Sequence, residues 1–330
     1  MHPELFQLPI VHVTVKSYGT MMVIGFVLAV LLMRRLMKGQ GENPENIVNL
    51  ALYALIAGVI GARIMYVVDY WPNYRDDPLS VLAVWQGGLV YLGGVILAVA
   101  MVLIYLFARR LPVRMYLDVL SIGLMLGLSF GRIGCFLNGC CFGKVTDGPL
   151  GVRFPYGSPA YLNQVFPDLG RNRAEPLLEL PAEYFGYLGE DGQWYPVEKD
   201  AVKLQAPLKP RRLLTDEQLE QVTRGPCQAR PVHPTQLYSS ANAALLFLIL
   251  YLFWRFAGRS RPGTTFSLMF ILYGCARFGL EMLRNDNPFL YDKWWVIYQG
   301  GTESQNLGLY MAALGTAFLI FFWVRGRKRA

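Results

Sequence analysis

The sequence predicts an all-α polytopic membrane protein, with seven transmembrane helices and a small external α+β head inserted between spans four and five. Its composition is typical of a membrane protein, since 54% of the 330 residues are hydrophobic and only 16% are charged. Seven apolar runs approach or exceed the ~20 residues that a bilayer-spanning helix needs. A single long hydrophilic stretch separates the fourth run from the fifth.

The seven apolar runs give the spans in chain order. The first is expected to remain in the protein as an anchor, because Glu4 precedes it and no small-residue cleavage site follows Met33. We place the spans at residues 17–33, 47–68, 88–108, 116–137, 236–254, 266–283 and 307–324.

Basic residues gather at one end of the spans. That side carries thirteen lysines and arginines, whereas the short segments of the opposite side carry three, namely Lys16, Arg75 and Lys293. Loops rich in lysine and arginine stay in the cytoplasm. The C-terminus is therefore expected to be cytoplasmic and the N-terminus outside.

The hydrophilic stretch divides the chain into three parts. Residues 1–143 hold spans one to four, residues 144–232 form the external head, and residues 233–330 hold spans five to seven. Within the head, residues 150–154 and 193–197 alternate as short strands do. Residues 215–218, Thr-Asp-Glu-Gln, form a capping box that predicts the start of a short helix.

Charge and cysteine content exclude several classes of protein. The net charge of +8 arises from clusters at the ends of apolar runs, so it reflects membrane topology and predicts no nucleic-acid partner. Five cysteines without repeated spacing do not make a disulfide scaffold. With only three histidines, the sequence predicts no metal site and no cofactor.

The stretch at residues 131–143, GRIGCFLNGCCFG, carries the first candidate site residue. Arg132 follows an apolar run, and a charge within a span is retained only when it faces the bundle interior or water and has a partner. The flanking glycines allow close backbone approach, and Asn138 supplies donors and acceptors beside the charge. This pattern predicts an anion pocket at the edge of the lipid.

Span six contributes a second group of polar residues. Tyr273, Arg277, Glu281 and Arg284 recur at helical spacing and share one face. In one interpretation, Arg277 and Glu281 are an internal ion pair that stabilises the bundle. In the other, two guanidiniums from separate spans face one carboxylate, and the surplus positive charge binds a phosphodiester, which arginine contacts bidentately.

Polar residues also begin spans one and five. Tyr18 donates to the anion or anchors the helix at the interface. In the stretch 233–238, HPTQLY, His233 is the histidine near the pocket, and Gln236 contacts substrate or satisfies open amides. Arg63 and Asp69 in span two are expected to serve structure.

These motifs resemble a known family. Residues 131–143 are similar to the signature of the bacterial prolipoprotein diacylglyceryl transferases, Gly-Arg-x-Gly-Asn-Phe-x-Asn-x-Glu-x-x-Gly. The supporting matches, in family order, are Tyr18-Gly19, residues 85–88 (WQGG), residues 233–238, and Tyr273-Gly274 with Arg277 and Glu281. They cover nearly all of the membrane domain.

The resemblance implies an activity and a location. It implies seven helices in the bacterial cytoplasmic membrane and transfer of a diacylglyceryl group from phosphatidylglycerol to the lipobox cysteine of preprolipoproteins. Membrane lipid and the precursor signal peptide would be the partners. Arg132 and Arg277 match the family's two arginines at the phosphate, Asn138 and Gly143 its signature residues, and Tyr18, Tyr273 and Glu281 its supporting polar residues.

Three positions depart from the family pattern. Cys135 stands in place of Asn, Cys140 in place of Glu, and Leu92 where many members have a histidine proposed as general base. His233 or Glu281 could substitute as the base. The departures leave open an alternative, a weakened or inactive relative that binds phospholipid or lipoprotein precursor without transfer.

The cysteines permit several interpretations. Cys140 could form a disulfide with Cys135 or Cys227 in an oxidising compartment. A thiolate relay or metal site is less expected, because no histidine or further cysteine is spaced to complete a tetrahedral set. The preferred interpretation is small apolar side chains filling a tight helix break. A membrane thiol oxidoreductase built on Cys140 and Cys141 is a third function class, without a Cys-x-x-Cys motif to support it.

Overall fold

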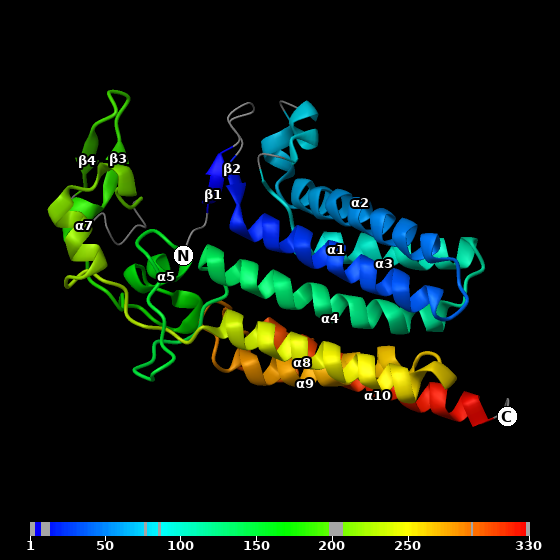
Figure 1. Cartoon of the computed structure of the whole chain (residues 1–330). Helices are drawn as coiled ribbons and strands as arrows, with labels where there is room; N and C mark the ends of the chain where they lie inside the picture. The colour runs from blue at the N-terminus through cyan, green and yellow to red at the C-terminus, as the bar shows by residue number, and fades with distance from the viewer. Residues whose placement is uncertain are drawn as a thin grey trace. The chain divides into compact units, whose positions relative to one another are not determined.

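The structure, a computed structural model, describes residues 4–7, 14–75, 78–84, 87–197, 207–291 and 293–327. It is mostly helical, and six helices among the described residues are long and apolar enough to cross a membrane (Figure 1). These are α1 (Ser17–Lys38), α2 (Pro44–Asp69), α3 (Tyr91–Ala108), α4 (Val113–Asn138), α8 (Thr235–Phe256) and α10 (Glu303–Arg327).

The predicted span at residues 266–283 corresponds to α9 (Thr264–Glu281), which is not among these six. It is 18 residues long and carries Arg277 and Glu281 within its length. Because α9 ends at Glu281, Arg284 lies in the turn that follows rather than on the helix face predicted for it.

The remaining elements are short. The sheets among the described residues are two antiparallel pairs of strands. One pairs β1 (Glu4–Gln7) with β2 (Thr14–Lys16), and the other pairs β3 (Gly186–Leu188) with β4 (Trp194–Pro196). Among the described residues, the other α-helices are α5 (Pro159–Val165) and α7 (Asp216–Thr223). The 3-10 helices are η1 (Trp71–Tyr74), η2 (Pro78–Leu82), η4 (Leu169–Arg171), η5 (Ala182–Tyr184), η6 (Arg211–Leu213) and η7 (Gly258–Ser260).

The chain forms two compact units, each described by itself. The first comprises residues 1–26, 125–249 and 268–317, and the second residues 27–124, 250–267 and 318–330. The predicted division into residues 1–143, 144–232 and 233–330 stays a prediction.

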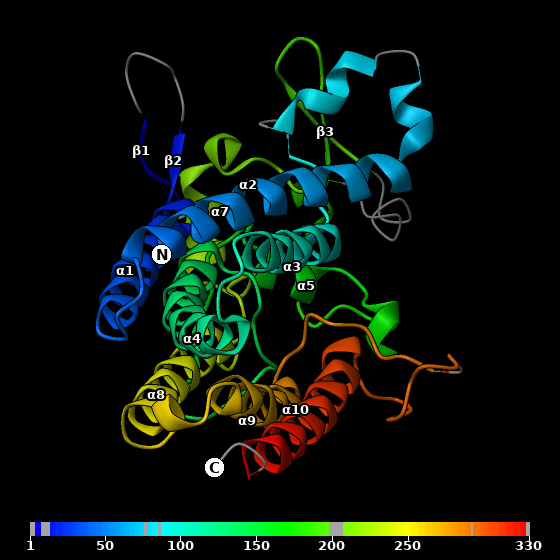
Figure 2. The same ribbon diagram turned by 90° about the vertical axis from the view of Figure 1, so that its right-hand side faces the viewer.

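Glycines bring α2 and α3 of the second unit into close contact, and the two helices lie side by side (Figure 2). A Cβ atom at Gly61 would lie 2.4 Å from the carbonyl oxygen of Gly93, and one at Gly93 would lie 2.4 Å from that of Gly61. Both positions therefore require glycine. Arg63, expected to be structural, donates to the carbonyl oxygens of Ser80 and Gly87, each at 2.8 Å, and so fixes the segment before α3. Of the predicted motif at residues 85–88, Trp85 and Gln86 lie outside the described residues.

The head segment, in the first unit, has a small core of its own. Tyr161, Tyr184 and Phe185 are buried there with Cys227, and the Tyr161 hydroxyl donates to the Cys227 carbonyl at 2.7 Å. Burial raises the pKa of Tyr184 to about 12. The predicted capping box is confirmed, because Thr215 precedes α7 with both reciprocal hydrogen bonds.

Of the two strands expected in the head, one is confirmed. The strand predicted at residues 193–197 is β4, which pairs with β3. The strand predicted at residues 150–154 is reduced to an isolated bridge between Val152 and Val232, because the neighbouring residues find no continuous partner strand among those described.

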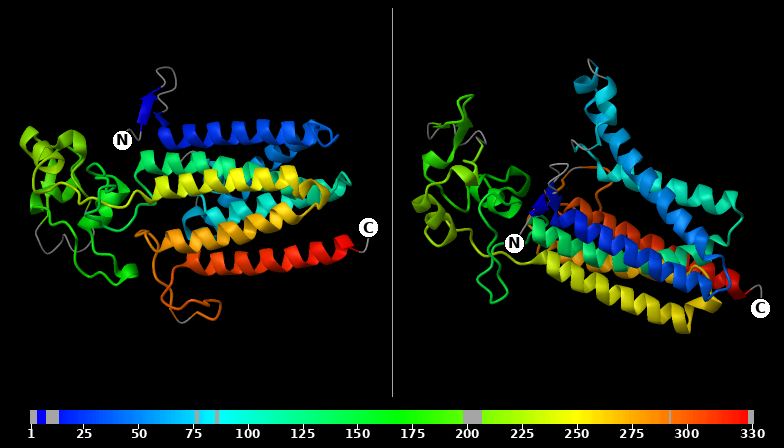
Figure 3. Two further views of the ribbon diagram at one scale, coloured as in Figure 1. Left: turned by 60° about the horizontal axis from the view of Figure 1, so that its bottom comes forward. Right: turned by 45° about the horizontal axis from the view of Figure 1, so that its top comes forward.

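In the first unit, α9 and α10 run side by side (Figure 3). A Cβ atom at Gly274 would lie 2.5 Å from the carbonyl oxygen of Gly308, so glycine sets the closeness of the two helices at this level. This approach places Arg277 and Glu281 of α9 against the beginning of α10.

Candidate functional site

Arg132 of α4 and Arg277 of α9 line one cavity in the first unit. The cavity is small, about 10 Å³, and Tyr273, Ser239 and Asn242 contribute further polar side chains to its wall. Arg132 makes no hydrogen bond or ion pair with the residues that the structure describes, and its interactions with neighbouring charges are electrostatic only. Its guanidinium therefore presents free donors to the cavity.

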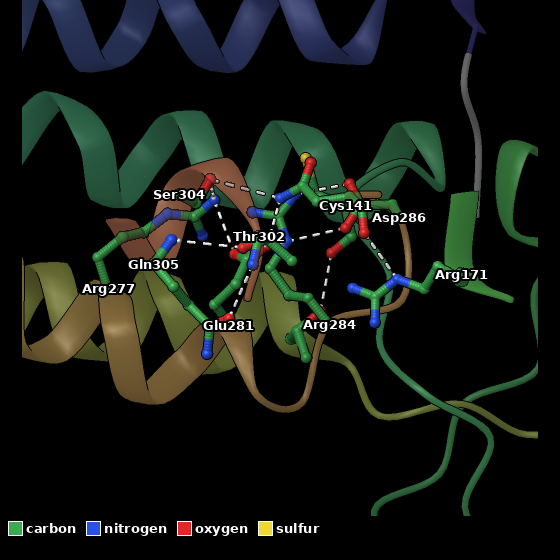
Figure 4. Close-up of polar contacts among 11 residues, drawn as sticks. Cys141, Arg171, Arg277, Glu281, Arg284, Asp286, Thr302, Ser304 and Gln305 are labelled. Carbon is green, nitrogen blue, oxygen red and sulfur yellow. Dashed lines mark hydrogen bonds and ion pairs between the residues drawn. The ribbon is translucent and has the colours of Figure 1, made fainter. Parts of the chain in front are cut away.

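Arg277 is held in place by a buried carboxylate. Its guanidinium forms an ion pair with Glu281 at 2.9 Å and donates to the Ser304 hydroxyl at 2.6 Å (Figure 4). The Glu281 side chain is fully buried, and it also accepts from Thr302 at 3.1 Å and from Asn287. One turn of α9 and the start of α10 thus fix the second arginine of the cavity.

A further arginine follows α9. Arg284 binds Asp286 through two hydrogen bonds, of 2.9 and 2.6 Å, and lies 3.6 Å from Glu281. Burial alone would lower the pKa of Arg284, but the hydrogen bonds and charge of Asp286 outweigh it and the net shift is upward. With Arg132 and Arg277, three guanidiniums face two carboxylates, so the network carries a surplus positive charge.

The loop after α9 is attached to the head segment. Arg171 donates to the Asn287 carbonyl at 2.7 Å, and Asn285 donates to Asn163 of α5 at 3.0 Å. The Arg171 guanidinium also lies 4.6 Å from the centre of the Phe289 ring. Burial lowers the pKa of Arg171. Residues from the head thus hold the loop that carries Asp286 and Asn287.

The end of the 131–143 stretch lies between two other segments. The Gly143 amide donates to the His233 carbonyl at 3.0 Å, and the Lys144 amide donates to the Leu283 carbonyl at 2.8 Å. A Cβ atom at Gly143 would lie 2.6 Å from the Cβ atom and carbonyl oxygen of His233, so only glycine fits. These contacts bring the 131–143 stretch against both α8 and the turn after α9.

Three thiols gather where α4 ends. The Sγ atoms of Cys135, Cys140 and Cys141 all lie within 4.8 Å of one another, and each residue is a free cysteine. Cys227 is a free cysteine in the head core, so Cys140 forms no disulfide with Cys135 or Cys227 in this structure. Hydrogen bonds from the Cys135 and Cys140 thiols, with the charges of Arg284 and Arg132, lower the pKa of Cys141 although burial opposes them.

Two family comparisons bear on this arrangement. The model of the family described as prolipoprotein diacylglyceryl transferase matches residues 3–321. The chain belongs to this family.

Named relatives are similar over most of the chain. A phosphatidylglycerol--prolipoprotein diacylglyceryl transferase of Rhodopirellula baltica is 29% identical, covering 84% of this chain and 67% of the relative. The proteins of the same name from Clostridium tetani and Burkholderia orbicola are each 28% identical, covering 87% and 96% of this chain and 86% and 92% of their own lengths. Membership of this transferase family, together with the helices, makes the chain a multi-pass membrane protein.

Three further residues predicted for a diacylglyceryl transferase site lie at helix ends: Tyr18 at the start of α1, Asn138 at the end of α4 and Gln236 at the start of α8. The Tyr18 ring packs against Gly134, because a Cβ atom added at Gly134 would lie 3.2 Å from Cδ2 of Tyr18. The Asn138 side chain lies beside the Cys140 thiol, which donates to the Cys135 carbonyl at 3.7 Å. Gln236 is buried and donates to the Cys140 carbonyl at 2.7 Å, while its own Oε1 atom finds no partner among the described residues.

The bases suggested for this transferase differ in their surroundings. The buried Nδ1 atom of His233 has no hydrogen-bond partner among the described residues. Glu281 accepts hydrogen bonds through Oε1, whereas its buried Oε2 atom accepts none from the described residues and is held by ion pairs with Arg277 and Arg284. Leu92, in the first turn of α3, is 54% exposed and brings no ionisable group.

Sequence reasoning missed several members of the network. Ser304 and Arg171 have partners far away in the chain. Asp286 and Asn287 have near partners, Arg284 and Glu281, but they lie in a loop where no helical spacing pairs them. Arg284 had a local signal, its i+3 spacing from Glu281.

Proposed function

We propose that this protein transfers the diacylglyceryl group of phosphatidylglycerol to the cysteine thiol of prolipoproteins, the reaction for which its relatives are named. The cysteine would be that of the lipobox in a precursor signal peptide. The reaction forms a thioether carbon–sulfur bond, breaks the carbon–oxygen bond to phosphate, and releases glycerol phosphate.

The observation that carries the proposal is the single cavity lined by Arg132 and Arg277. A phosphodiester is the guest that suits two guanidiniums near lipid, because arginine binds phosphate oxygens through paired hydrogen bonds. Arg132 supplies free donors, and the surplus positive charge of the network favours an anion. The cavity of about 10 Å³ would have to widen to admit a head group, and the acyl chains would extend into the bilayer.

The contacts of the other residues suggest their roles. As the ester bond breaks, charge grows on the departing phosphate, and the two arginines stabilise it. Glu281, paired with Arg277 and accepting from Thr302, acts as a positioning residue rather than a base. Tyr273, beside Arg277 in the cavity wall, is a further head-group contact, with Tyr18 at the nearby helix start. Gln236, Asn138 and Gly143 shape the loop around the site.

Seven spans in the cytoplasmic membrane, with the N-terminus outside and the C-terminus in the cytoplasm, fit this reaction. An α9 of 18 residues rises about 27 Å, close to the ~30 Å hydrocarbon core, so it is long enough for the additional span. Its polar residues would face the cavity instead of lipid. The head at residues 144–232 would then lie on the outer side, where exported precursors emerge.

Purified protein in phosphatidylglycerol micelles, given a lipobox peptide, tests the proposal by mass spectrometry. We expect the peptide to gain one diacylglyceryl group. Arg132→Ala and Arg277→Ala should each lower the rate by at least ~10²-fold, because each removes a charge-stabilising group. Arg224→Ala, at an exposed arginine of the head, is the matched control and should keep the rate.

Two results would contradict the proposal. Unchanged turnover in either cavity variant would refute the role of the arginines. Binding of lipid or peptide without any thioether product would instead identify the alternative, a relative that binds without transferring.

A further inference from the structure

The three thiols at the end of α4 are brought together by an unusual backbone. Gly139 has φ +75° and Cys141 has φ +59°, so the chain folds back over the last helical turn. The Cys140 amide then donates to the Cys135 carbonyl at 3.2 Å. A left-handed conformation at a residue with a side chain is strained and persists only where the surroundings hold it.

Two buried side chains of α8 hold this turn. Gln236 donates to the Cys140 carbonyl at 2.7 Å, and Thr235 donates to the Cys141 carbonyl at 2.8 Å. Both side chains lie in residues with 0% exposure. The positions of Cys140 and Cys141 are thus fixed from outside the turn, as a preorganised ligand set requires. A mere filling of the helix break would need neither contact.

We propose that Cys135, Cys140 and Cys141 bind a zinc ion through three thiolates, and that its fourth position takes the acceptor cysteine whose sulfur is alkylated. The proposal rests on the proposed transfer function for the identity of that acceptor. It assigns to the metal the thiol activation that Leu92 cannot supply and that Glu281, paired with two arginines, is poorly placed to supply; the unpartnered Nδ1 atom of His233 is the competing base.

The spacing suits zinc. Tetrahedral zinc with Zn–S bonds of ~2.3 Å holds its sulfurs about 3.8 Å apart, and the three Sγ atoms here lie within 4.8 Å of one another. Among the described residues, no histidine or carboxylate joins this group. Thiolate ligands select zinc or Cu(I). Three protein ligands with an open fourth position are the pattern of catalytic zinc, whereas structural zinc has four.

The surrounding charges suit the same ion. Zinc with three thiolates carries one net negative charge. The guanidiniums of Arg284 and Arg132 both interact electrostatically with Cys141 and offset that charge, so in the zinc-bound protein the arginines would hold the phosphate through hydrogen bonds without a surplus positive charge. No carboxylate is needed in the ligand set.

The location suits the chemistry. Cys135 lies three residues after Arg132 on α4, so the two side chains share a helix face. An acceptor thiol that binds the metal loses its proton to water, because a coordinating thiol is deprotonated. The thiolate sulfur then forms a bond to the glyceryl carbon, the bond from that carbon to the phosphate oxygen breaks, and the phosphate leaves with the electron pair. The neutral thioether is a weak ligand and leaves the zinc.

Metal content of the purified protein tests the ligand set without reference to activity. Protein purified in detergent, or loaded with Zn²⁺ and desalted, should hold one zinc per chain by elemental analysis. Cys135→Ser and Cys140→Ser should each lower zinc affinity at least tenfold. Cys227→Ser and Cys275→Ser, at free cysteines outside the group, should retain the metal. Absence of zinc after loading of the wild-type protein would overturn the proposal.

Cobalt(II) tests the open position. The Co²⁺-loaded wild-type protein should show a thiolate-to-metal absorption band that grows when a lipobox peptide with cysteine is added, and not when serine replaces that cysteine. A spectrum unchanged by either peptide would overturn the fourth-ligand role. Selective binding of Cu(I), which three thiolates saturate, with no effect of peptide would overturn it too.

The failure of this proposal can be told apart from failure of the proposed function. Zinc removal from the wild-type protein by a chelator should stop transfer, and added Zn²⁺ should restore it. Full transfer by zinc-free protein would overturn the metal site and leave the transferase function standing. Zinc binding that responds to the cysteine peptide, without any transfer, would retain the site and overturn the function.

Discussion

The Glu281 carboxylate accepts a hydrogen bond from Thr302 and forms ion pairs with two arginines, and replacement by glutamine separates these two roles. The side chain is fully buried, and its Oε1 atom accepts from Thr302 at 3.1 Å while Oε2 pairs with Arg277 at 2.9 Å and Arg284 at 3.6 Å. In Glu281→Gln the amide oxygen can still accept from Thr302. Its NH₂ group would face two guanidiniums, which are donors only.

The structure sets the size of the effect. Removing one partner of a buried ion pair costs about 3–5 kcal/mol. We expect the lower end, about 3 kcal/mol, because the Arg277 side chain is 14% exposed and Arg284 keeps Asp286. For a chain of this length the melting temperature should fall by roughly 4 °C. Transfer should fall about 10²-fold, since Arg277 loses the group that positions it.

The assay is thermal unfolding in detergent, paired with the rate of lipidation of a lipobox peptide. Glu303→Gln is the matched control, because Glu303 is exposed in the first turn of α10. It should melt within about 1 °C of the wild type and transfer at the same rate. Equal melting and equal transfer in Glu281→Gln and this control would refute the positioning role.

Two further substitutions test other parts of the first unit. Gly143→Ala should abolish transfer, because the added Cβ atom would lie 2.6 Å from the backbone and the side chain of His233. Gly279→Ala is the control and should keep transfer, because a Cβ atom there has nothing within 4 Å. Equal rates of the two variants in a peptide-lipidation assay would show that the loop tolerates the clash. Tyr161→Phe should destabilise the head by about 1–2 kcal/mol, because the Cys227 carbonyl loses a buried donor at 2.7 Å. Hydrogen exchange of the head amides measures this loss of stability. Exchange rates equal to those of the wild type would show that the hydrogen bond contributes nothing.

Local signals in the sequence were sufficient for the helices and for part of the site. Apolar runs located the membrane helices, although α1 continues to Lys38 because a helix need not end where its apolar run ends. The pairing of Arg277 with Glu281 followed from their i, i+4 spacing, and the capping box at Thr215 from its residue types.

Features that depend on tertiary contacts could not be predicted in this way. Asp286 lies only two residues from Arg284, but residues at this spacing do not face each other on a helix, so their pairing depends on how the loop after α9 is held. The gathering of Cys135 with Cys140 and Cys141 depends on a left-handed turn at a non-glycine residue, which sequence preferences argue against. Sequence spacing predicts no set of four protein ligands for a tetrahedral metal, whereas a site that receives its fourth ligand from a substrate needs only three.

The head segment contacts the loop after α9, which gives this insertion between two membrane helices a structural role at the site. Asp286 and Asn287 hold Arg284 and Glu281, yet both lie on a loop without regular structure. Arg171 binds that loop through the Asn287 carbonyl, and the Phe289 amide donates to the Gly170 carbonyl at 2.8 Å. Buried guanidiniums need partners with fixed geometry, because a guanidinium without one pays the full cost of desolvation. The inner part of the insertion therefore fixes the polar network from outside, and shortening it around η4 should loosen the arginines before it unfolds any membrane helix.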